Sequence, residues 1–409
     1  MVKLSWMGVT MLTLEQIKDA ASVLNGNIRK TDLIAAPNLT ANNTIFLKCE
    51  NLQTTGAFKI RGAFYKISQL TDEEKQKGVV ACSAGNHAQG VALSAQQNNI
   101  RSTIFIPSTA PISKIEATRS YGAEIKLIDG VYDDAYDAAV KYYKETGATF
   151  VHPFDDEMVI AGQGTIGLEL LEQLPDLDAI VVPIGGGGLI AGIALCVKSI
   201  NPKCKIYGVQ AEGAPSMVNA FEAHRLMSLE KVSTVADGIA VKTPGSLTFE
   251  LCEKYVDEIF TVTEDEIATA ILTLMEQQKL IAEGAGAVAV AAALFNKIPV
   301  QNKNVACIVS GGNIDVTILS RVIHRGLLTS GRLSDLTIEL VDKPGQLKEV
   351  STIIADLGAN VVRVRHNPGG KNTDINECHL KVSMETKNHE HLNEIKNTLE
   401  KKGYKITKG

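Results

Sequence analysis

The chain has 409 residues, of which 45% are hydrophobic and 21% are charged, and its formal net charge is −5. This balance gives no basic surface for nucleic acid, and no run reaches the ~18 apolar residues that a membrane span needs. The N-terminus begins no signal peptide, because its apolar stretch is short and no small-residue cleavage site follows. We therefore expect a cytoplasmic globular protein of two or three domains.

Short apolar strands alternate with helical patterns from residue 14 to residue 330. This alternation predicts an α/β fold, a parallel sheet flanked by helices. Ligands of such sheets bind at the carboxyl ends of the strands. The seven cysteines are odd in number and show no Cys-x-x-Cys spacing, so buried free thiols are expected. The clearest strand patterns are residues 102–107, 124–128, 149–152 and 205–209.

The first motif is residues 55–65, Thr-Gly-Ala-Phe-Lys-Ile-Arg-Gly-Ala-Phe-Tyr. Lys59 lies between Phe58 and Ile60, and a lysine among apolar neighbours is desolvated. Desolvation depresses the pKa of the amine and makes it nucleophilic, as a Schiff-base lysine must be. Taken alone, a lysine in an amphipathic segment is more often a solvated side chain whose stem covers apolar surface.

The second motif, residues 83–90, joins a strand pattern at 78–82 to a helical pattern at 91–95. Small residues at such a junction let backbone N–H groups approach an anion at the start of the helix. Asn86 can donate to an oxygen of a cofactor. His87 is either a catalytic base or, as we favour, a first-turn residue with a local hydrogen bond.

The third motif is the tetraglycine run at 185–188 with Leu189, between a strand pattern at 179–184 and a helical pattern at 190–195. A flexible linker is not expected there, whereas a cradle of backbone donors for a phosphate is. The run matches neither the Walker loop nor the dinucleotide fingerprint. The fourth motif, Ser-Gly-Gly-Asn at 310–313, follows a strand pattern at 305–309. A lysine anchor, an asparagine and a phosphate loop together indicate pyridoxal phosphate (PLP).

In this order the four motifs resemble those of the threonine dehydratases (threonine ammonia-lyases) of the fold-type II PLP family, over residues 12–330. The resemblance implies that Lys59 carries PLP, Asn86 contacts the ring hydroxyl and Ser310 faces the pyridine nitrogen. It also implies that an apolar loop at 238–241 covers one ring face. The cofactor contacts expected are Phe58, Lys59, Asn86, Gly185, Gly186, Gly187, Gly188, Leu189, Gly238 and Ser310. The substrate carboxylate is expected at the turn formed by Ser83, Ala84, Gly85, Asn86 and His87.

The reaction that the resemblance implies is β-elimination of L-threonine to 2-oxobutanoate and ammonia, with L-serine converted more slowly to pyruvate. Related serine racemases carry a second serine where this chain has Ala84, which cannot exchange a proton. Racemisation needs a proton-exchanging group on each face of the carbanion, and elimination needs only one. Elimination is therefore favoured. The alternatives are a serine racemase and an amino-acid-sensing protein with an inactive core.

The same resemblance implies a catalytic domain at residues 1–330, in which a small lobe at about 53–155 is inserted into a large lobe. One departure is Ala57, where such families usually carry serine. Some relatives hold a divalent cation near the position of Glu212. Here Met217 and Val218 occupy the region of the downstream acidic partner, so no metal site is expected.

Beyond the linker-like stretch at 328–332 the pattern changes to βαββαβ, which is ferredoxin-like. The turn Asp-Lys-Pro-Gly-Gln-Leu at 342–347 resembles that of ACT domains, the amino-acid-sensing modules of metabolic enzymes. Residues 334–409 are therefore expected to bind a small-molecule effector near Pro344, Gly345, Leu347 and Asn360. Alternatively this domain serves only oligomerisation, and in either case a homo-oligomer, dimer or tetramer, is expected. The expected elements are strands at 336–341, 360–366, 376–384 and 404–406 and helices at 346–354 and 389–402.

Overall fold

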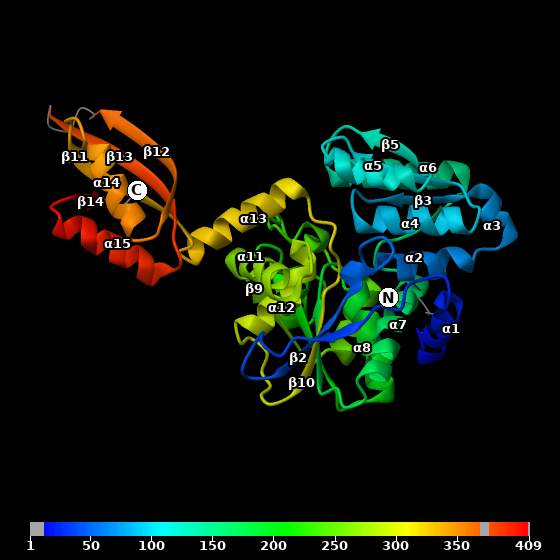
Figure 1. Cartoon of the computed structure of the whole chain (residues 1–409). Coiled ribbons are helices and arrows are strands. Elements are labelled where there is room, and N and C mark those ends of the chain that lie inside the picture. Colours follow the sequence, from blue (N-terminus) through cyan, green and yellow to red (C-terminus); the bar gives the residue numbers. More distant parts are fainter. Residues whose placement is uncertain (1–11, 369–375, 408–409) are drawn as a thin grey trace. The chain divides into compact units, whose positions relative to one another are not determined.

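The computed structural model describes residues 12–368 and 376–407, and Figure 1 shows the path of the chain. The chain divides into two compact units, Met1–Ile318 and Leu319–Gly409, called unit 1 and unit 2 below. Within the described ranges no helix is both long and apolar enough to cross a bilayer. Each of the seven cysteines is a buried free thiol, as the sequence predicts.

Unit 1 contains two sheets. The larger has the order β1-β2-β10-β7-β8-β9 and is parallel except for the pairing of β1 with β2. The smaller has the order β5-β4-β3-β6 and is parallel throughout. The α/β expectation is therefore confirmed. The strands are β1 Leu33–Ala35, β2 Thr44–Lys48, β3 Val79–Cys82, β4 Ser102–Pro107, β5 Glu124–Ile128, β6 Thr149–Phe150, β7 Ala179–Pro183, β8 Lys205–Ala211, β9 Glu258–Val262 and β10 Asn304–Ile308.

Helices flank both sheets of unit 1 (Figure 1). Every residue of β7 is buried, because a central parallel strand is covered on both faces and so consists of one continuous apolar run. The helices are α1 Leu14–Leu24, α2 Lys59–Ser68, α3 Asp72–Lys77, α4 Asn86–Gln97, α5 Ile112–Ser120, α6 Tyr132–Thr146, α7 Glu157–Gln173, α8 Gly188–Ile200, α9 Ser216–Ala223, α10 Ser246–Tyr255, α11 Glu264–Thr273 and α12 Gly284–Leu294. Short 3-10 helices lie at η1 Glu50–Leu52 and η2 Asp237–Ile239, and a π-helix at η3 Leu274–Gln278.

The strands of the smaller sheet all lie between β2 and β7 in the sequence, so this sheet is an insertion into the larger one. The second, third and fourth motifs follow β3, β7 and β10, each at the carboxyl end of a parallel strand. The first motif runs into α2, whose first residue is Lys59. The motifs thus occupy the strand ends at which ligands of α/β sheets bind.

Unit 2 contains an antiparallel sheet of order β12-β13-β11-β14 and two helices that pack on it, which confirms the βαββαβ pattern. Its core includes Ile338, Ile354, Leu380 and Ile395. A bulge interrupts β12 between Val361 and Arg363. The elements are β11 Leu333–Val341, α14 Gln346–Asp356, β12 Asn360–Pro368, β13 Glu377–Glu385, α15 His389–Lys401 and β14 Lys405–Thr407, preceded by α13 Val316–Thr329.

The linker-like stretch at 328–332 lies within unit 2 and is structured, which corrects the sequence interpretation. Leu333 already begins β11, and Thr386 N donates to Arg332 O at 2.9 Å. Gly331 has φ +68° and lies against His389, so its glycine serves a tight turn there. Composition suggested flexibility, but these backbone groups have fixed partners within unit 2.

Candidate active site

Lys59 is half-buried at the start of α2. Its Nζ donates to Pro153 O at 2.7 Å and lies 5.2 Å from the centroid of the Phe58 ring. Burial lowers the pKa of Lys59 to about 8, against the opposing charge of Glu283. The amine therefore has the lowered basicity that a nucleophilic lysine needs.

Backbone contacts hold the Lys59 segment against the fourth motif. Phe58 N donates to Ser310 O at 3.1 Å, and Gly312 N donates to Gly56 O at 2.8 Å. Between them Ala57 forms an isolated antiparallel bridge with Gly311. Backbone hydrogen bonds thereby hold two motifs side by side that are about 250 residues apart in the sequence.

A cluster of buried charged side chains holds α2 in place. Arg61 lies two residues after Lys59 and is 1% exposed, and its guanidinium donates to both Glu50 oxygens at 2.8 Å. Its Nη1 donates to Glu169 Oε1 at 2.6 Å, and Lys48 Nζ donates to Glu169 Oε2 at 2.6 Å. Burial would raise the pKa of Glu50, but Arg61 and Lys48 hold it below its ordinary value. The cluster fixes the register of the helix that carries Lys59.

Asn86 begins α4 and is held from two sides. Its Nδ2 donates to Glu283 Oε1 at 2.6 Å, and its Oδ1 accepts from Asn313 Nδ2 at 2.8 Å. Asn313 Nδ2 also donates to Thr55 O at 2.7 Å. The second and fourth motifs therefore meet at Asn86, in a chain of hydrogen bonds that ends on Glu283.

Glu283 is the site residue that sequence reasoning missed. It is 4% exposed, and burial together with the charge of Asp237 raises its pKa to about 7, against the hydrogen bond from Asn86. It lines a cavity of about 120 Å³ together with Lys114, Asp237 and Asn313. The available signal was a single charge among small and apolar residues at 281–288. Perturbed buried carboxyls of this kind concentrate at functional sites.

His87 is buried in the first turn of α4, but its hydrogen bond is not local. Its Nε2 lies 2.8 Å from Val151 O, and its Nδ1 has no partner among the described residues. Burial and the nearby Lys59 lower the pKa of His87 to about 3. The local interpretation was wrong because the start of α4 packs against the chain that leaves β6, 64 residues away. In the same turn, Gly85 N donates to Ser83 Oγ at 3.2 Å.

The tetraglycine loop joins β7 to α8, and one of its glycines is required by its backbone conformation and another by a close contact. Gly187 has φ +100°, in the left-handed region that favours glycine. A Cβ at Gly186 would lie 2.4 Å from the ring of Phe154. Thr248 Oγ1 donates to Gly186 O at 2.6 Å, which fixes the carbonyl of the loop. The loop therefore presents backbone N–H groups at a helix N-terminus, where anions bind.

The remaining predicted cofactor contacts lie around these groups. Ser310 is buried after β10, and its hydroxyl donates to Ala285 O at 3.3 Å. A Cβ at Gly238 would lie 3.4 Å from Glu283 Oε1, and one at Gly185 would lie 3.1 Å from Ile239. The loop at 238–241 thus connects Glu283 with the tetraglycine loop, and Leu189 lies buried in the first turn of α8.

The structure does not bring the four predicted effector residues together. Pro344, Gly345 and Leu347 are exposed where the chain leaves β11 and enters α14. Asn360 pairs with Glu385, which pairs with Leu333 at the opposite end of β11. Within one chain Asn360 is therefore separated from the turn by the length of strand β11. A site that uses all four residues requires a second copy of unit 2.

Comparison with known protein families shows the family of this chain. Residues 24–311 match the family described as pyridoxal-phosphate dependent enzymes. The chain belongs to this family. Residues 331–402 match the ACT domain.

Two relatives of this PLP-dependent enzyme span nearly the whole chain. The L-threonine ammonia-lyases of Thermotoga maritima and Geobacter sulfurreducens are 52% and 45% identical, and each alignment covers 97% of this chain and 99% of the relative. Among solved structures, the processed form of threonine deaminase isoform 2 from Solanum lycopersicum has a TM-score of 0.73 at 38% identity, covering 78% of this chain and 89% of the other. Maize serine racemase also has a TM-score of 0.73, at 36% identity, covering 78% and 98%.

The residues present fit PLP. Lys59 has the lowered pKa of a Schiff-base amine, the glycine loop offers donors at the start of α8, and Ser310 supplies a neutral hydroxyl. His87 contributes a buried ring nitrogen with no partner among the described residues, directly beside Asn86. A nucleophilic amine, a phosphate cradle and short polar side chains are the groups that this cofactor requires.

Proposed function

We propose that the protein is an L-threonine ammonia-lyase, which converts L-threonine to 2-oxobutanoate and ammonia, and L-serine more slowly to pyruvate. The observation that carries the proposal is that hydrogen bonds join the segments of Lys59, Asn86 and Ser310. The tetraglycine loop packs against Phe154, the residue after the Pro153 carbonyl that accepts from Lys59. Relatives of that activity at 45–52% identity over nearly the full length support it.

In this proposal PLP is held at Phe58, Lys59, Asn86, Gly238 and Ser310, with its phosphate at residues 185–189. When bound, the cofactor supplies an electron sink for the charge left when the Cα proton departs. Lys59 Nζ removes that proton, since its lowered pKa leaves much of the amine unprotonated near pH 8. The turn at 83–87 binds the substrate carboxylate through backbone N–H groups at the start of α4.

Serine racemase is the second candidate, because the maize racemase shares the fold at a TM-score of 0.73. Against it stands Ala84, a half-buried methyl group in the substrate turn that cannot exchange a proton. Ala84→Ser should raise exchange of the Cα proton with solvent deuterium, or D-serine formation, above the unmodified enzyme. Equal rates in both proteins would show that Ala84 does not restrict the reaction.

The deciding experiment is a product assay on the purified holoenzyme. Incubation with L-threonine should yield 2-oxobutanoate and ammonia in equal amounts, and L-serine should yield pyruvate at a lower rate. D-serine as the main product from L-serine would instead identify a racemase. Binding of amino acids without either product would identify a sensor with an inactive core.

The further assignments concern domains, partners and location. We infer a catalytic domain at residues 1–330 and an ACT domain at 334–409 that responds to a small-molecule effector. The protein is expected to be a cytoplasmic homo-oligomer, dimer or tetramer. The net charge of −5 supports the expectation that nucleic acid is not a partner. The match of residues 331–402 to the ACT domain supports the effector role.

A further inference from the structure

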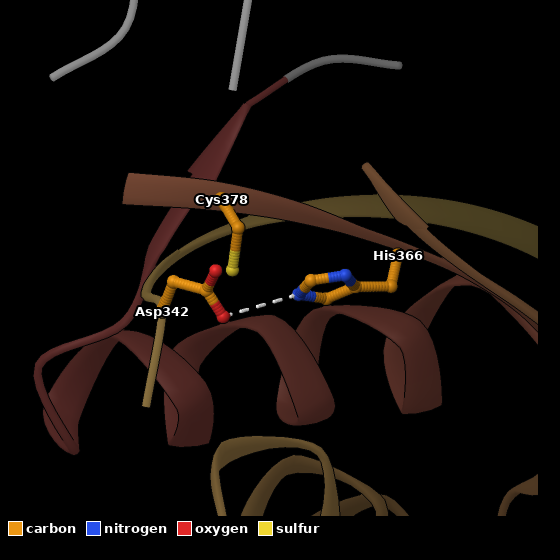
Figure 2. Close-up of side chains that lie close together, drawn as sticks. All are labelled: Asp342, His366 and Cys378. Atoms are coloured by element: carbon orange, nitrogen blue, oxygen red, sulfur yellow. Dashed lines mark ion pairs between the residues drawn. The ribbon is translucent and has the colours of Figure 1, made fainter. Parts of the chain in front are cut away.

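Unit 2 contains a cluster of potential ligands that the four motifs and the effector residues do not include. Figure 2 shows Asp342, His366 and Cys378 pointing toward one another. One carboxylate oxygen, one imidazole nitrogen and the sulfur all lie within 4.8 Å of each other. Asp342 Oδ1 and His366 Nε2 are 3.6 Å apart. The three groups come from three different segments of the sheet.

The strand register explains why these three side chains share a face. Directly opposed residues of an antiparallel pair point to the same side, and so do residues two apart on one strand. On β13, Cys378 pairs with Leu340 of β11, and two residues later Leu380 pairs with His366 of β12. Asp342 lies two residues after Leu340, and its N–H donates to Asn376 O at 2.8 Å. The cluster thus runs diagonally from the residue that follows β11, across β13, to β12.

The bulge in β12 is what places His366 on this face. Before the bulge Val361 pairs with Met384, and after it Arg363 pairs with Ser383. An uninterrupted ladder would set His366 opposite His379 and turn its ring to the other side of the sheet. The extra residue therefore aims the imidazole at Cys378, and bulges commonly re-aim side chains at functional sites.

The types of the three ligand atoms indicate which class of metal ion they would bind. We propose that Asp342, His366 and Cys378 form a binding site for a borderline divalent transition-metal ion such as Zn²⁺. Calcium and magnesium take oxygen ligands, whereas thiolate, imidazole and carboxylate together suit zinc. Ligand atoms of a tetrahedral zinc stand about 3.3–3.8 Å apart, so the 3.6 Å separation of Asp342 and His366 already fits. Cys378 needs to approach by about 1 Å at most.

Access and protonation are both compatible with this site. Asp342 and His366 are 54% and 47% exposed, so an ion can reach them from solvent, while Cys378 is buried beneath them. Burial and the charge of Asp342 raise the pKa of the Cys378 thiol. Binding must therefore displace that proton: the sulfur–hydrogen bond breaks, sulfur coordinates the ion, and one proton leaves to solvent per ion bound.

The test is zinc binding by the full-length holoenzyme, first treated with a chelator and then dialysed against buffered free Zn²⁺. Wild type should bind one zinc ion per chain. The variants His366→Ala and Cys378→Ala should bind that ion about tenfold more weakly or not at all. His379→Ala is the matched control, because His379 is the next residue of β13 and its side chain points to the other face. It should bind as wild type does. In weak buffer, zinc should release one proton per chain from wild type and none from Cys378→Ala.

Two results would overturn the site. One is wild type binding no more zinc than the double variant of His366 and Cys378, and the other is His379→Ala losing as much zinc as His366→Ala. Far-ultraviolet circular dichroism and cofactor absorbance check that each variant is folded. If Cys378→Ala fails to fold because it disturbs the core, His366→Ala decides, since that side chain is half exposed.

Discussion

Lys59 combines a lowered pKa with a fixed position, and both are needed for an amine that binds a cofactor and moves a proton. Lys59→Ala should abolish turnover of L-threonine while leaving circular dichroism unchanged. Borohydride reduction of the native holoenzyme followed by peptide mapping should place the phosphopyridoxyl label on Lys59. Lys66→Ala is the control, because Lys66 lies on the same helix but bonds to Asp156 at 2.9 Å. A label on any other lysine contradicts the assignment.

Glu283 should make the stability of the protein depend on pH near neutrality. Its pKa is raised to about 7 in the fold, so between about 4.5 and 7 the folded state binds more protons than the unfolded state. The stability that Glu283 contributes is present below about 4.5 and is lost as pH rises through 7. The loss amounts to at most about 3 kcal/mol.

Glu283→Gln removes this titration and keeps an oxygen that can accept from Asn86. In urea unfolding of the apoenzyme, the variant should gain stability relative to wild type between pH 5 and pH 8. Absorbance of the bound cofactor in the two holoenzymes, compared over the same pH range, reports whether Asn86 has moved. A difference between the two proteins that stays constant with pH would show that Glu283 does not titrate in this window.

At the scale of the element, the Arg61 cluster shows how α2 is anchored. Glu50→Gln leaves the buried guanidinium of Arg61 with one anionic partner fewer, which should lower the free energy of unfolding by about 3 kcal/mol. The pKa of Glu50 is lowered, so in wild type its contribution is present at neutral pH and is lost as pH falls below about 4.3 toward the folded-state pKa. Urea unfolding at pH 7 measures the change.

The matched control is Glu172→Gln, which breaks an exposed ion pair with Lys30. Such pairs contribute about 1 kcal/mol or less, because water screens both charges. If both substitutions cost the same, the buried cluster does not hold α2 as proposed. A loss of cofactor affinity in Glu50→Gln alone would further connect the cluster with Lys59.

Sequence patterns predicted strands and loops correctly where the whole pattern of an element lay within one continuous segment. The strand and loop around residues 179–189 could be identified because a buried parallel strand is apolar throughout and the glycines follow at once. The partners of Asn86 could not, because Glu283 and Asn313 lie about 200 residues away and meet it only in the fold. The partner of His87 was missed for the same reason. The opposite placement of Asn360 and Pro344 follows from the strand register, which local patterns do not specify.

At the scale of the whole molecule, we propose that unit 1 carries out catalysis and the ACT domain binds the effector. A chain ending at Arg332 should keep L-threonine turnover and lose any response to isoleucine, valine or another small ligand. The physical reason is linkage: an effector changes activity only if it binds two states of the enzyme with different affinity. Initial rates with and without each amino acid measure the response.

The outcomes of this truncation separate the two interpretations of the tail. Regulation that survives in the shortened chain would place the sensor outside residues 334–409. Loss of the cofactor, or precipitation, would instead give the tail the role of an oligomerisation surface. Leu347→Asp in the full chain is the companion variant, because Leu347 is an exposed apolar residue beside the predicted effector turn. It should weaken the response without changing basal turnover.

The contact of Phe154 with the glycine loop links two positions in the evolution of this enzyme. A side chain at Gly186 would overlap the aromatic ring, and one at Gly188 would lie 2.8 Å from the Phe154 carbonyl. Alanine at position 186 therefore clashes with the ring of Phe154, and a smaller residue at 154 would remove that clash. Variation at the two sites should be strongly epistatic, with a smaller residue at 154 having to arise first. The contact thus restricts the order in which substitutions at 154 and 186 can be tolerated.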